Sequence, residues 1–265
     1  EIALSRYLIS TLAEYQTEFW VIVGQALRQR GAEVHFVSFD SRSNELLARA
    51  GLPFFDATAS AVAARLGDED PLAVCHRFGI ADPLPWLTHE KFAFGLRDSD
   101  ALVRKLAGIL LVVDDAVKDI AHPVSVVQEL GGFLSVLGTH FAAKARGLAS
   151  WFIEPSFFRS RLLFIEGSLA AFHHPGDARA KPEGAVAQYL DETTRQNLIV
   201  IPEKDRHQYT TAFRKVVNLR NMRRLTEKMI DKYLLKKEQE FGHIGSHVFT
   251  HARMIAASRK LARHY

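Results

Sequence analysis

Two glutamates close two short apolar runs within IEPSFFRSRLLFIEG, residues 153–167. Glu154 ends the first run and Glu166 ends the second, with a Pro-Ser turn and two arginines between them. A carboxylate at the end of a buried strand can take or give a proton, and a neighbouring guanidinium keeps it ionised or binds an anionic substrate. The segment therefore predicts a site in which Glu154 and Glu166 are the candidate carboxylates and in which Arg159 and Arg161 hold them ionised or bind an anionic substrate. The alternative is a pair of strand-end glutamates that form ion pairs with Arg159 and Arg161.

A Gly-Gly pair lies between an expected strand and an expected helix. Gly131 and Gly132 follow an expected strand (Val124–Glu129) and precede an expected helix (Phe133–Arg146). Backbone N–H groups at a helix N-terminus attract anions, and glycine lets a phosphate or sugar approach closely. We therefore expect a ligand contact here, with a plain tight turn as the alternative. The chain has no GxGxxG and no GxxxxGK[ST] pattern, so neither a dinucleotide nor a nucleoside triphosphate is indicated.

Polar residues also follow the first expected strand. Glu14 and Tyr15 lie in a predicted loop, residues 10–17, whose polar groups suit sugar hydroxyls. The alternative is that the acids here only favour the start of a helix through its dipole. His174, in a Pro/Gly-rich stretch at residues 173–184, is a further candidate substrate contact.

Other reactive residues give weaker signals. Asp114 and Asp115 fall in a helical pattern, where adjacent side chains point to different faces and do not chelate one ion together, so we expect them on a solvated face of the helix. His247 and His251 share a helix face, but no Glu follows His247 as HExxH requires. No metal or other cofactor is therefore expected. Cys75 is the only cysteine, which excludes an internal disulfide and points to a reducing compartment.

The elements that position these residues alternate along the chain. Apolar runs alternate with helical spacing over residues 1–202, which predicts an α/β fold with a Rossmann-like, doubly wound, mostly parallel sheet. The proline-containing stretch 68–88 is expected to be irregular. The expected strands are Ile2–Ile9, Glu33–Phe39, Pro53–Phe55, Val124–Glu129, Ser150–Glu154 and Leu198–Ile201, and the expected helices in this part are Glu18–Arg30, Glu45–Ala50, Asp100–Ala121 and Phe133–Arg146.

The C-terminal part, residues 203–265, reads as a basic helical extension or a linker to a second lobe. We expect a long amphipathic helix over Asp205–Phe241 and a final helix over Ser246–His264. Between Lys204 and Lys237 there are eleven Lys or Arg against three acids. Such a stripe attracts nucleic acid, an anionic membrane face or an anionic glycan.

Composition narrows the class of protein. The chain has 265 residues, of which 48% are hydrophobic, and a net charge of +4. No apolar run approaches the roughly 20 residues that span a bilayer, and the N-terminus lacks the basic flank of a signal peptide. We expect a cytoplasmic protein, peripheral at most to the inner membrane.

The opening segment resembles a motif of bacterial capsule polysaccharide biosynthesis proteins, which include β-Kdo glycosyltransferases. In that family a strand ends in E-x-G-[FY]-[LI]-R-[SP], and a second acid follows shortly afterwards. The similar region covers about residues 124–201, and Pro155 stands where one branch of the family has Asp. The motif positions are occupied here by Glu154, Phe157, Phe158, Arg159 and Ser160, and Glu166 stands where the second acid is expected.

The resemblance implies a two-lobed glycosyltransferase of the GT-B kind, with this chain as the acceptor lobe and its crossing helices. It implies inverting transfer of Kdo or a related sugar from a CMP-activated donor to a glycan or lipid-linked acceptor of capsule or O-antigen. With Pro155 in place of Asp, the base would be Glu154 or Glu166. The rival hypothesis is a non-catalytic Rossmann-like binding or scaffold protein with a basic helical surface. Nucleic acid is not the expected partner, because no known recognition motif is present.

Overall fold

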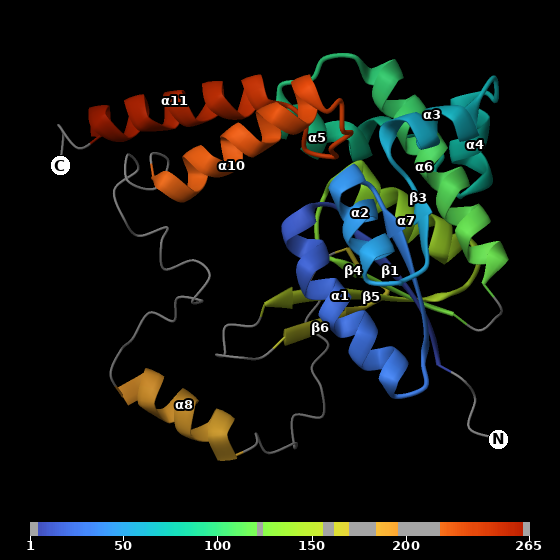
Figure 1. Ribbon diagram of the computed structural model, residues 1–265, viewed down its shortest axis with the longest axis horizontal. Helices are drawn as coiled ribbons and strands as arrows, with labels where there is room; N and C mark the ends of the chain where they lie inside the picture. Colours follow the sequence, from blue (N-terminus) through green and yellow to red (C-terminus); the bar gives the residue numbers. More distant parts are fainter. Residues whose placement is uncertain (1–4, 121–123, 156–161, 170–183, 196–217, 262–265) are drawn as a thin grey trace.

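A six-stranded sheet in the order β3-β2-β1-β4-β5-β6 forms the centre of the molecule (Figure 1). The computed structural model describes residues 5–120, 124–155, 162–169, 184–195 and 218–261. Neighbouring strands are parallel except β6, which is antiparallel to β5. The predicted Rossmann-like α/β sheet is therefore confirmed at the level of fold class. The strands are β1 (Arg6–Thr11), β2 (Glu33–Ser38), β3 (Phe54–Asp56), β4 (Ser125–Glu129), β5 (Ala149–Pro155) and β6 (Leu162–Glu166).

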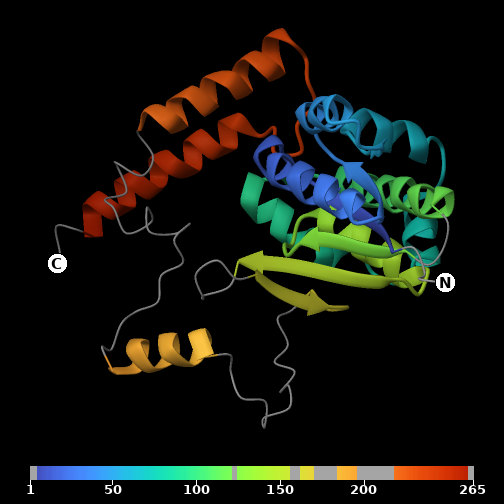
Figure 2. The same cartoon turned by 60° about the horizontal axis from the view of Figure 1, so that its bottom comes forward.

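Helices cover both faces of the sheet, as Figure 2 shows. Successive strand residues point to opposite faces, so Leu8 and Ile9 of β1 belong to different core clusters. One face packs against α1 (Glu14–Gln29) and α2 (Ser41–Arg49). The other face packs against α3 (Ala59–Leu66), α4 (Pro71–Arg77), the 3₁₀ turn η1 (Leu84–Leu87), α6 (Ser99–Asp119) and α7 (Leu134–Ala145). Helix α5 (Thr88–Phe94) contacts η1.

The long helix expected over residues 100–121 is confirmed as α6. Its residues are buried on most sides, because α3, α4 and α7 all pack around it. Gly108 marks the closest approach: a Cβ there would lie 2.5 Å from the backbone oxygen of Val62 in α3. The packing of α3 against α6 therefore requires a residue without a side chain at this position.

We predict that Gly108→Ala lowers the free energy of unfolding by about 1–3 kcal/mol, because the added methyl group overpacks the interface of α3 and α6. Gly245→Ala is the matched control: it lies in a helix with nothing within 4 Å of an added Cβ. The control should keep or slightly raise stability, since alanine favours the helix by up to about 1 kcal/mol. Urea unfolding followed by circular dichroism measures both, and equal stability of the two variants would contradict the packing account.

Two predictions from the sequence are wrong in part: the irregular stretch at residues 68–88 and the long helix over Asp205–Phe241. Residues 68–88 contain α4 and η1, because Asp70 caps a helix that begins with Pro71, a favoured first position. The helix expected over Asp205–Phe241 does not continue to Phe241. The described part is α10 (Leu219–Met229), followed by a π-helical turn, η3 (Ile230–Leu234). Lys236 then takes a left-handed backbone (φ 50°), which directs the chain back to the body.

The segment that follows this turn packs against the α/β body. Ser41 donates its backbone N–H to the carbonyl of Glu238, and Glu238 donates its N–H to the Ser41 hydroxyl. Phe241 packs against the main core. The final helix is confirmed as α11 (Ile244–Leu261), which runs beside α10 away from the sheet in both views (Figures 1 and 2). The division at residue 202 stays a prediction, and the expected strand at 198–201 lies outside the described residues.

Helix α10 is amphipathic, and large apolar side chains of this helix are exposed to solvent. Its arginines are exposed, and one of them contacts the body: the Arg224 guanidinium sits 5.9 Å from the ring centroid of Tyr15. Its apolar face is open: Leu219 is 90% exposed and Met222 is 51% exposed. Helices of the body bury their apolar faces, so α10 presents an unusual surface for a globular protein.

Candidate functional site

The carboxyl ends of β1 and β4 define the first candidate location. The chain leaves β3 at one side of the sheet and returns at β4, beside β1, so the strand order reverses between β1 and β4. Ligands of open α/β sheets bind outside the carboxyl ends of the strands at such a point. Gln16, just after β1, donates a 2.8 Å hydrogen bond from Nε2 to Oε2 of Glu129 at the end of β4. The two sides of the reversal point are therefore joined by polar groups.

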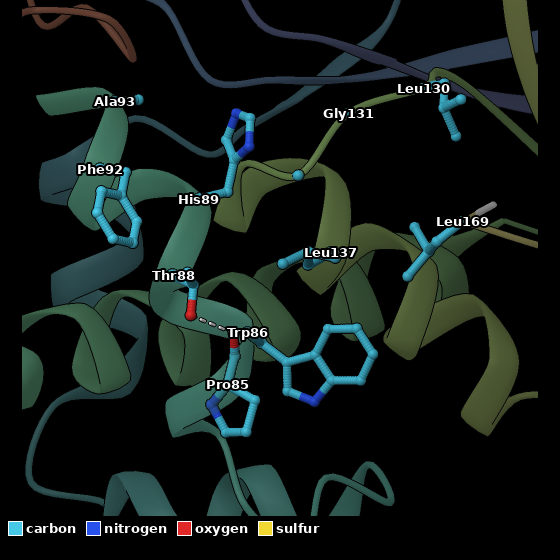
Figure 3. A pocket seen from close by; sticks show the side chains of 11 residues that line it. Pro85, Trp86, Thr88, His89, Phe92, Ala93, Leu130, Gly131, Leu137 and Leu169 are labelled. Carbon is cyan, nitrogen blue, oxygen red and sulfur yellow. Dashed lines mark hydrogen bonds between the residues drawn. The ribbon is translucent and has the colours of Figure 1, made fainter.

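A pocket of about 810 Å³ opens beside the end of β4, between α5 and α7 (Figure 3). Its size falls within the range of small-molecule sites, and its lining is mostly apolar. Trp86 and Phe92 supply aromatic rings, and Leu137 and Leu169 supply aliphatic surface. The predicted Gly131 and Gly132 both line this pocket, as do Pro85, Thr88, His89, Ala93 and Leu130.

The N-terminus of α7 is not an open anion site. Glu90 of α5 is 1% exposed and accepts a 3.0 Å hydrogen bond from the backbone N–H of Leu134, the first residue of α7. A Cβ on Gly132 would lie 2.8 Å from the His89 ring, so the glycine allows α5 to approach α7. The expected unpaired N–H groups are therefore satisfied in part by the protein's own carboxylate. The pair lines a pocket, but its geometry favours an uncharged group there over a phosphate.

Lys105 of α6 links Glu90 to the C-terminal segment. Its Nζ lies 2.7 Å from Oε1 of Glu90 and 3.0 Å from Oε1 of Glu240. The Glu240 side chain is 8% exposed, and burial raises its pKa while the Lys105 charge opposes that rise. Burial works against the charge on Lys105 as well, but the two carboxylates outweigh it and raise the lysine pKa. The three charges are thus mutually dependent.

We predict that Lys105→Met lowers the free energy of unfolding by about 3–5 kcal/mol, because it leaves two buried carboxylates without their shared cation. Lys118→Met is the control, since Lys118 is 49% exposed and its partner Asp114 also binds Arg146. That variant should lose less than about 1 kcal/mol. Chemical unfolding at pH 7 compares them, and similar losses in the two variants would show that the buried cluster has no special weight.

The sheet register separates the two glutamates of the opening segment. Glu154 pairs with Leu163, and Glu166 pairs with Trp151, so the carboxylates lie toward opposite ends of the β5–β6 pair. Their positions differ by an odd number of pairs, so they also point to opposite faces. The two candidates for the base therefore do not lie together. An antiparallel return strand places its last residue at the amino end of its partner.

Glu154 is the one that lies near the pocket. Glu129 pairs with Ile153, so Glu154 is level with Leu130, a residue of the pocket wall. Its half-buried side chain points to the same face as Phe152, which packs with α7 in the main core. Arg159 and His174 lie outside the described residues.

The predicted residues after β1 lie in a helix, not in a loop. Glu14 and Tyr15 form the first turn of α1, because the chain at Ala13 is extended and an acid in the first turn favours the helix. Both side chains are exposed at the carboxyl edge, where Glu14 is 4.0 Å from Arg42. Glu14 and Tyr15 therefore lie at the expected edge of the sheet, but in a helix and not in the predicted loop.

Sequence reasoning did not single out Asp40, the buried acid of this edge. It follows β2 and caps α2, accepting hydrogen bonds from the backbone N–H groups of Arg42 (2.9 Å) and Ser43 (3.1 Å). Its residue is 6% exposed, and burial raises its pKa from 3.8 to about 6. The charge of Glu14 adds to the rise, and that of Lys228 opposes it. The sequence contained one signal for this residue: Asp40 is an acid that directly follows the predicted strand EVHFVSF.

Because the folded state holds this proton more tightly than the unfolded chain, Asp40 should lower stability as pH rises from about 4 to above 6. We predict that Asp40→Asn, which keeps the cap oxygen, is more stable than wild type at pH 8 by about 1–3 kcal/mol. The advantage should disappear near pH 4. Unfolding at a series of pH values tests this, with Asp70→Asn at an exposed cap as the comparison. A pH-independent difference would contradict it.

The other reactive residues have structural partners. Asp114 is buried and pairs with Arg146 and Lys118, and Asp115 pairs with Arg65, so they point apart as predicted. Asp114 is not on a solvated face, contrary to expectation. Cys75 is buried, and burial raises its pKa to about 11. Among the residues that the structure describes, no group of three His, Cys, Asp or Glu could hold a metal ion.

The fold and the site thus define an α/β protein of Rossmann-like class with a pocket at the carboxyl edge of its sheet. Comparison of the chain with protein-family models, curated proteins and solved structures found no significant match. In the described part of the chain, no helix is both long and apolar enough to cross a bilayer.

Proposed function

We propose that this chain is the acceptor lobe of a GT-B glycosyltransferase for bacterial surface polysaccharide. The reaction is inverting transfer of Kdo or a related sugar from its CMP ester to a glycan or lipid-linked acceptor. The observation that carries the proposal is the pocket beside β4, with Glu154 level with its wall. The resemblance of residues 154–166 to the capsule biosynthesis motif supplies the reaction class.

The pocket lining suits a sugar or the lipid next to it. A pyranose ring has faces of C–H groups that pack against aromatic rings such as Trp86 and Phe92, while its rim needs polar partners. Backbone at Gly131 and Gly132 is accessible for such partners. Glu90 already places a negative charge at the start of α7, so the pocket favours an acceptor over a phosphate group.

Glu154 is the proposed base. Its carboxylate takes the proton of the acceptor hydroxyl as that oxygen attacks the anomeric carbon of the donor. The bond from this carbon to the phosphate oxygen breaks, and CMP leaves with the bonding electron pair. Cationic side chains, with Arg159 as the motif candidate, balance the charge of the leaving phosphate and the sugar carboxylate, and no metal is part of the proposal.

The basic C-terminal helices would hold the enzyme near its acceptor. Helices α10 and α11 together carry seven Lys or Arg against one acid: Arg220, Arg223, Arg224, Lys228, Arg253, Arg259 and Lys260 against Glu227. An anionic membrane attracts such a surface, and lipid-linked acceptors reside there. The proposed location is the cytoplasmic side of the inner membrane, with peripheral contact and no nucleic-acid partner.

We predict that Glu154→Gln lowers transfer by about 100-fold or more, because a carboxamide does not accept the proton. The assay uses the full-length gene product, CMP-Kdo and a synthetic lipid acceptor, with product mass and CMP release as readouts. Glu166→Gln makes the same chemical change at the other end of the β5–β6 pair, and we expect this variant to retain most activity.

Equal losses in the two variants would contradict the choice of Glu154. No transfer by the wild-type protein, with either a lipid-linked or a free glycan acceptor, would remove the enzymatic proposal. That result would favour the rival hypothesis, a non-catalytic binding protein with the same fold and basic surface.

A further inference from the structure

Helix α10 and the turn η3 carry large apolar side chains that the fold leaves in solvent. None of the residues of α10 is buried, whereas most of those in α6 are. The exposed apolar residues of α10 and η3 are 40–90% accessible: Leu219, Met222, Met229, Ile230, Tyr233 and Leu234. Apolar surface that continues over successive helical turns marks a contact with a partner.

Two polar side chains hold α10 and η3 to the α/β body. The Arg224 guanidinium lies 5.9 Å from the ring centroid of Tyr15 in α1. Asp231 is buried and accepts hydrogen bonds of 3.0 and 2.7 Å from the Arg42 side chain in α2. Arg224 and Asp231 are seven residues apart, which is about two helical turns, so they mark the side of the helix that faces the body.

The apolar side chains lie on the opposite side of α10. Met222 and Met229 are also seven residues apart, and this pair is offset from the body-facing pair by two positions. Two positions turn a helix by about 200°, so both methionines point away from the body. Leu219 stands three positions before Met222, on the same side. The α/β body is therefore not the partner of this apolar face.

The cations around the apolar face indicate the charge of its partner. Helices α10 and α11 carry seven Lys or Arg and one acid, and that acid, Glu227, already accepts a 2.7 Å hydrogen bond from Arg223. Lys232 and Lys236, within and just after η3, are exposed as well. A second copy of the chain would bring the same positive charge to the contact and be repelled. The partner that fits is both anionic and apolar.

An anionic lipid surface has both properties. A helix that lies in a membrane interface has one apolar face, Lys or Arg on its polar side and too little hydrophobicity to span the bilayer. Helix α10 has this composition. It projects from the body beside α11 in both views (Figures 1 and 2), and a fluid lipid surface accepts a convex helix without a preformed groove.

We propose that α10 and η3 lie in the plane of an anionic lipid surface, with the face of Leu219, Met222 and Met229 buried among the lipid headgroups. The contact rests on the proposed function for the identity of the membrane, and it goes beyond attraction of charges because apolar side chains enter the lipid. It also fixes an orientation. Tyr15 and Arg42 contact the other side of the helix, so the carboxyl edge of the sheet lies close to the lipid surface.

Vesicle cosedimentation of the full-length protein tests this contact. The vesicles are phosphatidylcholine with or without phosphatidylglycerol, and binding is expected only with the anionic lipid. Met222→Ser combined with Met229→Ser should weaken partitioning by about 10- to 100-fold, because two large apolar side chains leave the lipid. The matched control, Leu72→Ser with Leu84→Ser, removes two apolar side chains of similar exposure from α4 and η1 and should bind as wild type does.

A fluorescent reporter separates insertion from attraction by charge alone. An environment-sensitive dye on Met222→Cys should shift to the blue with anionic vesicles, whereas the same dye on Leu72→Cys should not. Cys75 is buried, so the dye reacts at the introduced thiol. Arg220→Gln with Arg223→Gln should lower vesicle binding by about 10-fold or more, since each Lys or Arg near an anionic membrane adds to the attraction.

Unchanged binding of the double methionine variant, or a dye on Met222→Cys that does not respond, would overturn insertion of this face. Absence of wild-type binding to anionic vesicles would overturn it too, and a dimer that the double variant abolishes would assign the face to a second copy instead. Leu219→Ser with Tyr233→Ser is the test pair if circular dichroism shows that the double methionine variant is unfolded. Vesicle binding needs neither donor nor acceptor, so bound protein without transfer would remove only the proposed function.

Discussion

The ammonium group of Lys105, held between Glu90 and Glu240, is the interaction on which the carboxyl edge of the sheet depends. Glu90 caps α7, Lys105 belongs to α6, and Glu240 comes from the segment after α10. A buried charge costs several kcal/mol unless it is paired, so each of these groups requires the other two. The cluster therefore ties the start of α7 and the C-terminal segment to the same point.

This arrangement divides the carboxyl edge into two chemically different parts. Beside β4, the Glu90 carboxylate satisfies the first N–H of α7, and what remains is an apolar pocket with Trp86 in its wall. Beside β1, the Arg224 guanidinium of α10 lies over the ring of Tyr15. The two parts differ in character, because the first is lined mostly by apolar side chains and the second carries exposed polar and charged groups.

Much of the fold could be predicted because local signals and global structure agree. The period of the apolar residues in α6 and the unit from β4 to β5 matched the structure within about two residues at each end. Predictions failed where a tertiary contact overrode local pattern. The amphipathic period continues past Met229, yet the chain leaves the helix at Leu235, because Glu240 and Phe241 gain partners in the body.

The sequence predicted at which edge of the sheet the candidate site lies, but not which side chains meet there. Strand ends meet at one edge of a parallel sheet, so Gly131, Gly132, Glu14 and Tyr15 were placed correctly near that edge. The same rule does not apply to Glu166, because β6 is antiparallel, and an apolar run with a terminal acid looks alike in a parallel and an antiparallel strand. Asp40 shows the complementary case, in which the cap is visible in the sequence but the burial of the carboxylate is not.

The amino-acid sequence by itself determined the class of fold, the order of the central elements and the basic character of the C-terminal helices. These properties follow from periodicity and composition, which act over a few neighbouring residues. Only the tertiary structure decided which carboxylates lie apart, which helix N-terminus is already occupied and which buried charges pair. Those relations join residues as distant in sequence as Lys105 and Glu240, and no local pattern records them, since they depend on how complete elements pack.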